Sequence, residues 1–177
     1  MRRRDFCTSL LPAAAVGLLH GATLPRPASN LVIHMPNGRA PLQLSQFRGK
    51  VIAVEFLLTY CSHCQRASRT TDLIYRDLGA KGFVPVGAAI NPGGDVTGYV
   101  RDHNITFQVG SVPQESCMSF LQIPPMGKMM MPQVAFIDRS FNIVAQHSGD
   151  EPFFGENEEK NMRDLIENLL KPARKKS

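Results

Sequence analysis

An apolar run of strand length that ends at two closely spaced cysteines constrains this chain more than any other feature. The run covers residues 51–60, and the cysteines that follow it, Cys61 and Cys64, have the spacing C-x-x-C. A segment with helical character comes next, from about Ser62 to Leu78. A C-x-x-C pair that opens a helix directly after a strand is typical of a dithiol redox site.

The expected helix explains why this position favours redox chemistry. The first N–H groups of a helix and its positive dipole end favour an anion, so the first sulfur is stabilised as a thiolate. We therefore expect Cys61 to be the nucleophile and the more exposed of the two cysteines. Cys64, one turn further on, would resolve the mixed disulfide that Cys61 forms.

Two other interpretations of the cysteine pair stay open. The first is half of a zinc site, but zinc usually takes four ligands, and the chain has no second C-x-x-C and no H-x₃₋₅-H pair. The second is a static structural disulfide. The redox interpretation needs neither a metal nor a cofactor, and we expect none.

The residues around the pair resemble the active-site region of the thioredoxin superfamily. Gly49-Lys50-Val51 ahead of the strand is similar, more specifically, to the exported TlpA-like (AhpC/TSA-related) thiol–disulfide oxidoreductases. Tyr60 stands directly before the first cysteine, where that family usually has Trp. The resemblance covers about Pro41 to Leu170. It implies an α/β, thioredoxin-like fold with a central mixed β-sheet flanked by helices and an N-terminal β-hairpin.

The rest of the chain has the element order that this fold requires. Asn37-Gly38 is a strong signal for a tight turn and predicts a hairpin between residues 31–34 and 41–44. Asp95 is a candidate N-cap for a helix that ends near residue 104. Pro85 counts against a central position for the strand that contains it. We expect strands over 83–90, 107–110, 133–138 and 143–146, and helices over 62–78, 95–104, 116–121 and 156–170.

Glu55 lies in the middle of the apolar strand, six residues before Cys61. Burial of a carboxyl raises its pKa, which suits a group that transfers protons near neutral pH. The resemblance implies a buried acid at this offset, and Glu55 would then take the proton from Cys64. The alternative is a Glu at the edge of the strand that points to water.

The two residues between the cysteines, Ser62 and His63, should tune the redox potential. An imidazole beside the thiolate stabilises the reduced form, which makes the disulfide a stronger oxidant. We expect a potential above that of thioredoxin, which is about −270 mV. The alternative is that His63 is a solvated helix residue without such an effect.

Pro132 precedes the strand expected over residues 133–138. The resemblance implies a cis-proline here, opposite the cysteines, with neighbouring backbone that pairs with the substrate as a short added strand. Tyr60, Met131 and Pro132 would then contact the substrate. An ordinary trans-proline is the alternative.

Other sulfur-containing residues leave several interpretations open. Cys117 is either a reactive thiol or a buried, inert one, and we assign it no catalytic role. Met126, Met129, Met130 and Met131 either pack as a loop against the active site, contact a peptide, or bind Cu(I).

The first residues predict export. Arg2, Arg3 and Arg4 precede an apolar run over residues 10–19, which is typical of a signal peptide and too short to span a membrane. The order Arg-Arg-Asp-Phe resembles a twin-arginine signal. We expect a signal peptide over residues 1–28, with cleavage near Gly21-Ala22 or Pro27-Ala28, and a thioredoxin-like domain over 29–177. An uncleaved N-terminal anchor is the alternative.

Export implies an oxidising location, either the periplasm or the outer face of the cytoplasmic membrane. The formal net charge is +5, and removal of the arginine-rich first 22 residues leaves about +3, which is too weak to argue for nucleic acid. The basic C-terminal tail is expected to be solvated. We expect a monomer.

Together these features predict an exported thiol–disulfide oxidoreductase that exchanges disulfides with protein cysteines through its CSHC dithiol, with a membrane electron donor as a second possible partner. One alternative is a Cu(I) carrier of the same fold that uses Cys61, Cys64 and either His147 or methionines. Another is a thiol peroxidase, but the P-x-x-x-T-x-x-C pattern of that family is absent, since Val54 and Leu58 occupy its Pro and Thr positions.

Overall fold

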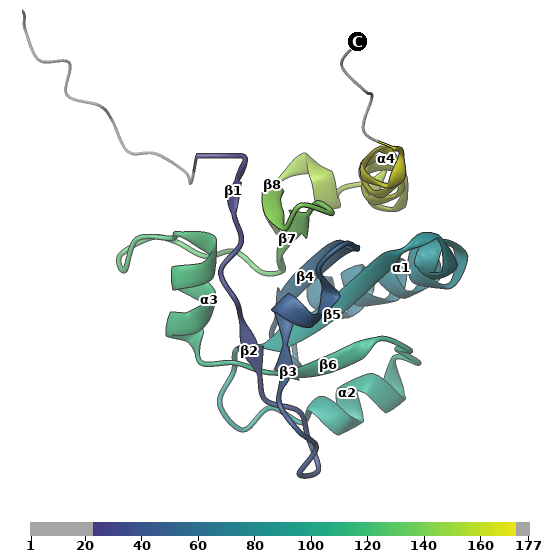
Figure 1. The fold of residues 1–177 in the computed structure, drawn as a ribbon. Coiled ribbons are helices and arrows are strands. Elements are labelled where there is room, and N and C mark those ends of the chain that lie inside the picture. Colours follow the sequence, from purple (N-terminus) through teal and green to yellow (C-terminus); the bar gives the residue numbers. More distant parts are fainter. Residues whose placement is uncertain (1–22, 173–177) are drawn as a thin grey trace, which may run out of the picture.

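The computed structural model of the chain describes residues 23–172 and contains a central six-stranded sheet (Figure 1). The strand order is β1-β8-β7-β4-β5-β6; β4, β5 and β6 run parallel, and β7, β8 and β1 each run antiparallel to their neighbours. The strands of this sheet are β1 (Arg26–Pro27), β4 (Val51–Leu57), β5 (Phe83–Ala89), β6 (Gln108–Ser111), β7 (Gln133–Ile137) and β8 (Asn142–Ser148). The helices are α1 (Ser62–Leu78), α2 (Val96–Asp102), α3 (Gln114–Leu121) and α4 (Glu158–Leu170).

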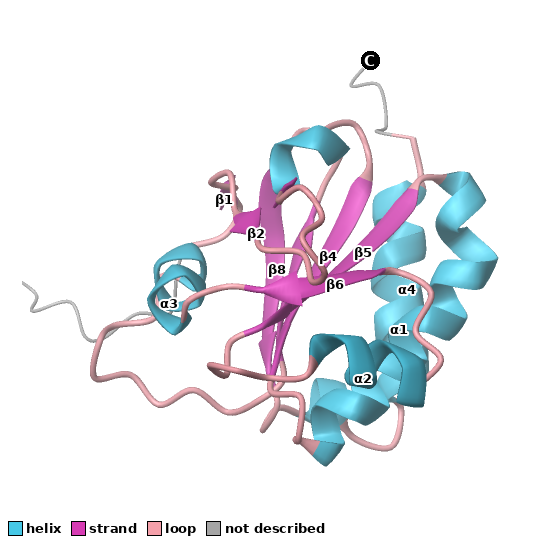
Figure 2. Ribbon diagram, turned by 90° about the horizontal axis from the view of Figure 1, so that it is seen from below, coloured by secondary structure: helices cyan, strands magenta, loops and turns pink. Residues whose placement is uncertain are grey.

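Helices cover the sheet on both sides, so the expected thioredoxin-like fold is confirmed (Figure 2). α1 and α4 pack together on one face, while α3 and the hairpin formed by β2 (Val32–Ile33) and β3 (Leu42–Gln43) lie against the other. The turn of this hairpin contains Asn37 and Gly38, both with positive φ. Within the described residues, no helix is both long enough and apolar enough to cross a bilayer.

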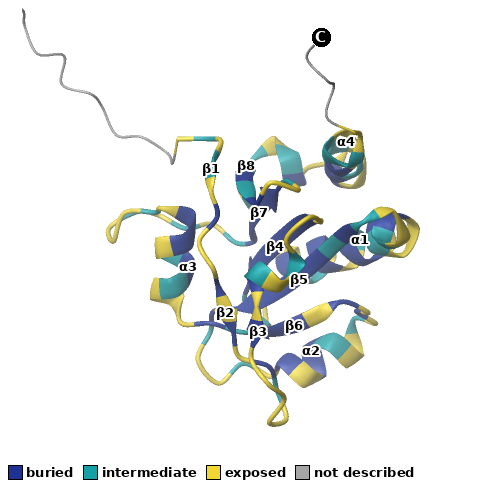
Figure 3. Cartoon of the chain, viewed as in Figure 1, coloured by how far each residue is buried: buried dark blue, intermediate teal, exposed yellow. Residues whose placement is uncertain are grey.

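The central strand β4 alternates between the two cores. Val51 and Ala53 pack toward α1 and α4, whereas Ile52, Val54 and Phe56 belong to the core under α3 and the hairpin. All seven β4 residues are buried (Figure 3). This arrangement places residue 55, between Ala53 and Leu57, on the side of the sheet that carries α1.

α1 begins and ends where the sequence pattern predicts, and its buried face includes polar residues. The apolar side chain of Leu73 is 54% exposed, whereas the polar residues Thr71 and Asp72 are buried. The Asp72 carboxylate accepts hydrogen bonds from the backbone and the hydroxyl of Thr106, each at 2.7 Å. The burial of Asp72 therefore joins α1 to the segment that precedes β6.

Pro85 lies in a central strand, although proline disfavours that position. It pairs with Ala53 of β4 on one side, but β6 begins to pair with β5 only at Val86. The missing N–H of Pro85 therefore costs no hydrogen bond to a neighbouring strand.

The N-terminal strand β1 falls within the range expected for the signal peptide. Arg26 and Pro27 pair with Ile143 and Asn142 of β8, and the Arg26 side chain donates to the carbonyl oxygen of Phe120 at 2.9 Å. The arginine-rich start, the apolar run and the end of the basic tail lie outside the described residues, so the signal peptide stays a prediction.

Candidate active site: a dithiol beside a buried carboxyl

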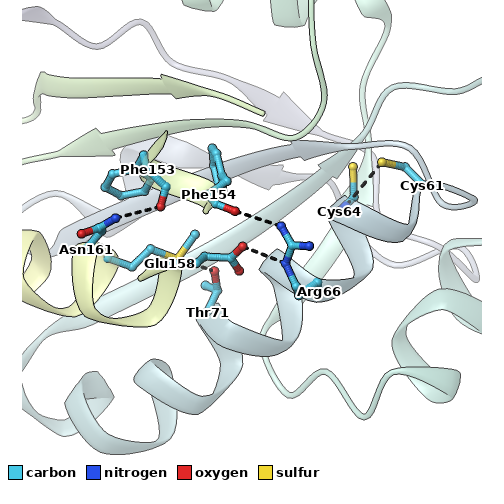
Figure 4. A network of polar contacts seen from close by, with 9 residues as sticks. Cys61, Cys64, Arg66, Thr71, Phe153, Phe154, Glu158 and Asn161 are labelled. Atoms are coloured by element: carbon cyan, nitrogen blue, oxygen red, sulfur yellow. Dashed lines mark hydrogen bonds and ion pairs between the residues drawn. The ribbon is translucent and has the colours of Figure 1, made fainter. Parts of the chain in front are cut away.

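The two cysteines lie at the start of α1 in different environments (Figure 4). Cys61 is the N-cap residue, and its sulfur accepts a hydrogen bond from the backbone N–H of Cys64 at 3.4 Å. Cys61 is partly exposed, whereas Cys64 is fully buried. The sulfur at the helix N-terminus is therefore the one that solvent and a substrate can reach.

Burial changes the chemistry of Cys64. Desolvation is the largest cause that raises the pKa of its thiol far above the usual range, and the hydrogen bond with Cys61 and the nearby charge of Glu55 raise it further. A thiol of this kind is a poor nucleophile until a base removes its proton. Any reaction in which Cys64 attacks therefore needs a proton acceptor inside the protein.

Glu55 is a buried carboxyl near this thiol. The residue is 1% exposed, and its Oε1 accepts a hydrogen bond from the Ser68 hydroxyl at 2.8 Å. Its Oε2 is buried and has no hydrogen-bond partner among residues 23–172. Desolvation raises the pKa of Glu55 to about 8, while the hydrogen bond from Ser68 acts in the opposite direction. The buried position and the raised pKa predicted for Glu55 are both present.

A hydroxyl pair that the sequence analysis did not identify extends from Glu55 to α2. The Ser68 hydroxyl lies 2.7 Å from the hydroxyl of Tyr99, and both residues are buried. The Tyr99 ring packs edge-on against His103, with 5.0 Å between the ring centroids. Ser68 follows Cys64 by four residues, so both side chains lie on the same face of α1. This spacing was the only signal in the sequence for the pair.

A second buried carboxylate, also not predicted, joins α1 to α4 (Figure 4). Oε2 of Glu158 lies 3.0 Å from Nε of Arg66, and Arg66 also donates to the carbonyl oxygen of Phe154 at 3.0 Å. Oε1 of Glu158 is buried without a hydrogen-bond partner in the described part of the chain. These contacts fix the helix that carries the cysteines against the C-terminal helix.

The loop before β7 is held in place by polar contacts. The Met131–Pro132 peptide bond is cis, as the resemblance implies. The Gln133 side chain donates to the carbonyl oxygen of Met130 at 2.6 Å and to the Ser148 hydroxyl at 2.8 Å. A Cβ added at Gly149 would lie 2.8 Å from the Pro132 nitrogen and closer still to the Met131 carbonyl. Only glycine at position 149 allows this close approach.

The remaining candidate side chains lie near the surface or in the core. Tyr60 is 73% exposed and His63 is exposed. Met131 is partly buried and packs both against the core under α3 and against the cluster that contains Cys64 and Tyr99. The four methionines do not form one group: Met126 and Met130 are exposed, whereas Met129 packs against the core.

Cys117 differs from the active-site pair in its surroundings. It is buried on α3, its sulfur lies 3.9 Å from the Met129 sulfur, and burial raises the pKa of its thiol to about 12. These features are those of an inert core thiol.

Between residues 23 and 172, no three His, Cys, Asp or Glu side chains are grouped so that they could hold a metal ion. His147, considered as a copper ligand, instead binds Glu151 through Nδ1 at 2.7 Å and stacks on Phe153 with a centroid distance of 3.8 Å.

Solved structures with the same fold carry thiol–disulfide names. A thioredoxin-family thiol:disulfide interchange protein from Chlorobium tepidum TLS has a TM-score of 0.68 and 21% identity, with 85% of this chain and 99% of that chain covered. A thiol:disulfide interchange protein from Bacteroides sp. has a TM-score of 0.64 and 17% identity, with coverage of 85% and 92%. A secreted Mycobacterium tuberculosis disulfide oxidoreductase, homologous to E. coli DsbE, has a TM-score of 0.62 and 15% identity, with coverage of 78% and 96%.

At these identities the solved structures establish the fold, and their names agree with the TlpA-like resemblance and with an oxidoreductase. No curated protein matches this sequence. A family profile, by contrast, matches residues 21–166, which is most of the chain and includes both cysteines, Glu55 and Pro132. The chain belongs to the Redoxin family.

Proposed function

We propose that this protein exchanges disulfides with protein cysteines through Cys61 and Cys64. The observation that carries the proposal is the pairing of an accessible sulfur at a helix N-terminus with a buried thiol and a buried carboxyl. Each group has a different task in thiol–disulfide exchange. Cys61 attacks, Cys64 resolves, and Glu55 accepts a proton.

The exchange proceeds in two steps when the protein acts as a reductant. The Cys61 thiolate attacks one sulfur of a substrate disulfide, which forms a mixed disulfide and releases the other sulfur as a thiolate. The proton of Cys64 then passes to Glu55, and the Cys64 thiolate attacks the Cys61 sulfur. The Cys61–Cys64 disulfide forms, and the substrate leaves with both of its sulfurs reduced. The same steps in reverse oxidise a dithiol.

The substrate polypeptide contacts Tyr60, Met131 and Pro132 in this proposal. Tyr60 offers an exposed aromatic ring directly before Cys61, and Met130 adds a partly exposed side chain on the loop before β7. Exposed aromatic and thioether groups suit a surface that accepts varied peptides. Ser62 and His63, both exposed between the cysteines, tune the potential of the pair.

The location proposed for this activity is the periplasm or the outer face of the cytoplasmic membrane. Its support is the predicted signal peptide, together with the secreted relative from M. tuberculosis. The proposed partners are envelope proteins with reactive cysteines and, if the protein acts as a reductase, a membrane electron donor.

Trapping of the mixed disulfide tests the exchange mechanism. Cys64→Ser removes the resolving thiol, so the adduct between Cys61 and the substrate should accumulate, whereas Cys61→Ser should abolish both adduct and activity. Adducts would be measured on non-reducing gels after incubation with cell-envelope proteins. Cys117→Ala on the Cys64→Ser background is the matched control and should leave the adduct in place. If Cys64→Ser collects no reducible adduct, the proposed exchange mechanism is wrong.

A further inference from the structure

The Ser68–Tyr99 hydroxyl pair has a direction that follows from counting hydrogens. Ser68 and Tyr99 each have one hydroxyl hydrogen. The Ser68 hydrogen is donated to Oε1 of Glu55 at 2.8 Å. In the 2.7 Å contact between the two hydroxyls, Tyr99 must therefore be the donor and Ser68 the acceptor. Both hydrogens point toward the carboxyl.

The opposite direction would leave a buried donor without an acceptor. If the proton of Glu55 sat on Oε1, Ser68 would accept it and would donate to Tyr99. Tyr99 is 3% exposed, and among residues 23–172 the only hydrogen-bond partner of its hydroxyl is Ser68. A buried hydroxyl without an acceptor is costly, commonly by about 1–3 kcal/mol. The direction in which Tyr99 donates to Ser68 avoids this cost.

The two oxygens of Glu55 consequently have different roles. Oε1 is held as a hydrogen-bond acceptor, and Oε2, which is buried and unpartnered in the described residues, is free to bind a proton. We propose that Ser68 and Tyr99 are positioning residues that fix Oε1 of Glu55 as the acceptor and leave Oε2 as the oxygen that takes up the proton. The assignment of Cys64 as the source of that proton rests on the proposed function.

Other charged groups also act on Glu55, and the test must separate them from the hydroxyl pair. Cys64 and Cys61 lie at the start of α1, and Glu158 on α4 raises the pKa of Glu55 through its charge, which Arg66 partly neutralises. His147 of β8 pairs with Val134 of β7, which in turn pairs with Glu55 of β4. The strand residues that flank Glu55, Gly87 and Val134, carry no charge.

Titration of the Glu55 carboxyl in three single variants tests the inference. The carboxyl signal would be followed by ¹³C NMR of reduced protein labelled at the glutamate side chains, with Glu55→Gln to assign the resonance. Ser68→Ala removes a donor that favours the ionised form, so the midpoint should rise by about one pH unit. Tyr99→Phe keeps the hydrogen bond from Ser68 to Glu55 but removes the Tyr99 hydroxyl that donates to Ser68. It should raise the midpoint by about half a pH unit.

Thr71→Val is the matched control, because it removes another buried hydroxyl from the same helix. Thr71 donates to the Met162 sulfur at 3.7 Å and not to Glu55, so the midpoint should not move. The inference is overturned if Ser68→Ala or Tyr99→Phe leaves the midpoint in place, or if Thr71→Val shifts it as far as Ser68→Ala does.

The pH profile of disulfide exchange, measured on the same variants, separates this inference from the proposed function. The profile should shift with the carboxyl midpoint in Ser68→Ala and in Tyr99→Phe. If the NMR midpoints shift while the exchange profile does not, Ser68 and Tyr99 still position Glu55, but Glu55 is not the base in the exchange reaction.

Discussion

Glu55 and Glu158 are two buried carboxyls with the same hydrogen-bond count and different partners. Each has one bonded oxygen and one buried oxygen without a partner in the described chain. The partner of Glu55 is a neutral hydroxyl, whereas that of Glu158 is the guanidinium of Arg66. A neutral partner leaves the charge of the carboxylate uncompensated, so a proton is needed to neutralise it. This difference supports the proposal that Glu55 takes part in proton transfer, whereas Glu158 joins α4 to α1 through Arg66.

The largest expected effect of this difference is on the pH dependence of stability. Burial raises the pKa of Glu55 from 4.5 to about 8 in the folded protein. Between these values the folded state keeps a proton that the unfolded chain has lost, so the free energy of unfolding falls as the pH rises. From pH 5 to pH 8, wild type should lose about 3 kcal/mol more than Glu55→Gln.

Urea denaturation at several pH values, with both proteins reduced, would measure this loss. Measurements well below pH 4.5 supply the internal reference, because there the wild-type carboxyl is protonated in both the folded and the unfolded state. Parallel curves for the two proteins would mean that Glu55 does not stay protonated in the fold.

The second effect concerns rate. Glu55→Gln removes the proposed proton acceptor while it preserves size, so disulfide exchange near pH 8 should slow by about 100-fold, within the usual range for general base catalysis. The loss should lie in the resolving step, which stopped-flow fluorescence with a labelled disulfide peptide would isolate. Glu158→Gln is the matched control and should retain most of the rate. Equal losses in the two variants would remove the distinction between the carboxyls.

The smallest effect is expected from breaking the helix contact. Glu158→Gln leaves Arg66 without its anionic partner, but Arg66 is 48% exposed and can turn to water. The free energy of unfolding should therefore fall by only about 1–2 kcal/mol, measured by urea denaturation. Arg66→Met, by contrast, would leave the Glu158 carboxylate buried without its cation and should destabilise more. A larger loss of stability in Glu158→Gln than in Arg66→Met would contradict this expectation. It would show that the buried charge of Glu158 does not decide the free energy of unfolding.

The sequence was most informative where one local signal decided the structure. The apolar strand, the C-x-x-C pair and the following helix placed α1 over the residues where the structure has it. Asp95 was predicted as an N-cap, and its side chain accepts from the Gly98 N–H at 2.7 Å. The resemblance implied a buried acid at Glu55, in the middle of an apolar strand, with a Glu pointing to water as the alternative, and the residue is 1% exposed.

The sequence was least informative where contacts join distant segments. Ser68 and Tyr99 are separated by 31 positions, and Arg66 and Glu158 by 92. No periodicity relates such residues, because their contact depends on how helices pack across the sheet. The burial of Asp72 beside the exposed Leu73 has a related reason, because the buried face of α1 depends on the segments that pack against it, such as Thr106 before β6.

If the predicted signal peptide is removed, the position of the cut decides whether strand β1 stays in the mature protein. Arg26 and Pro27 cover part of the outer side of β8, and a sheet edge left open is a template for pairing with another chain. Cleavage near Gly21-Ala22 would retain this cover, whereas cleavage at Pro27-Ala28 would remove it. Under the predicted processing, the later cut would therefore leave the outer edge of β8 open to pairing with another chain, and the earlier cut would keep it covered.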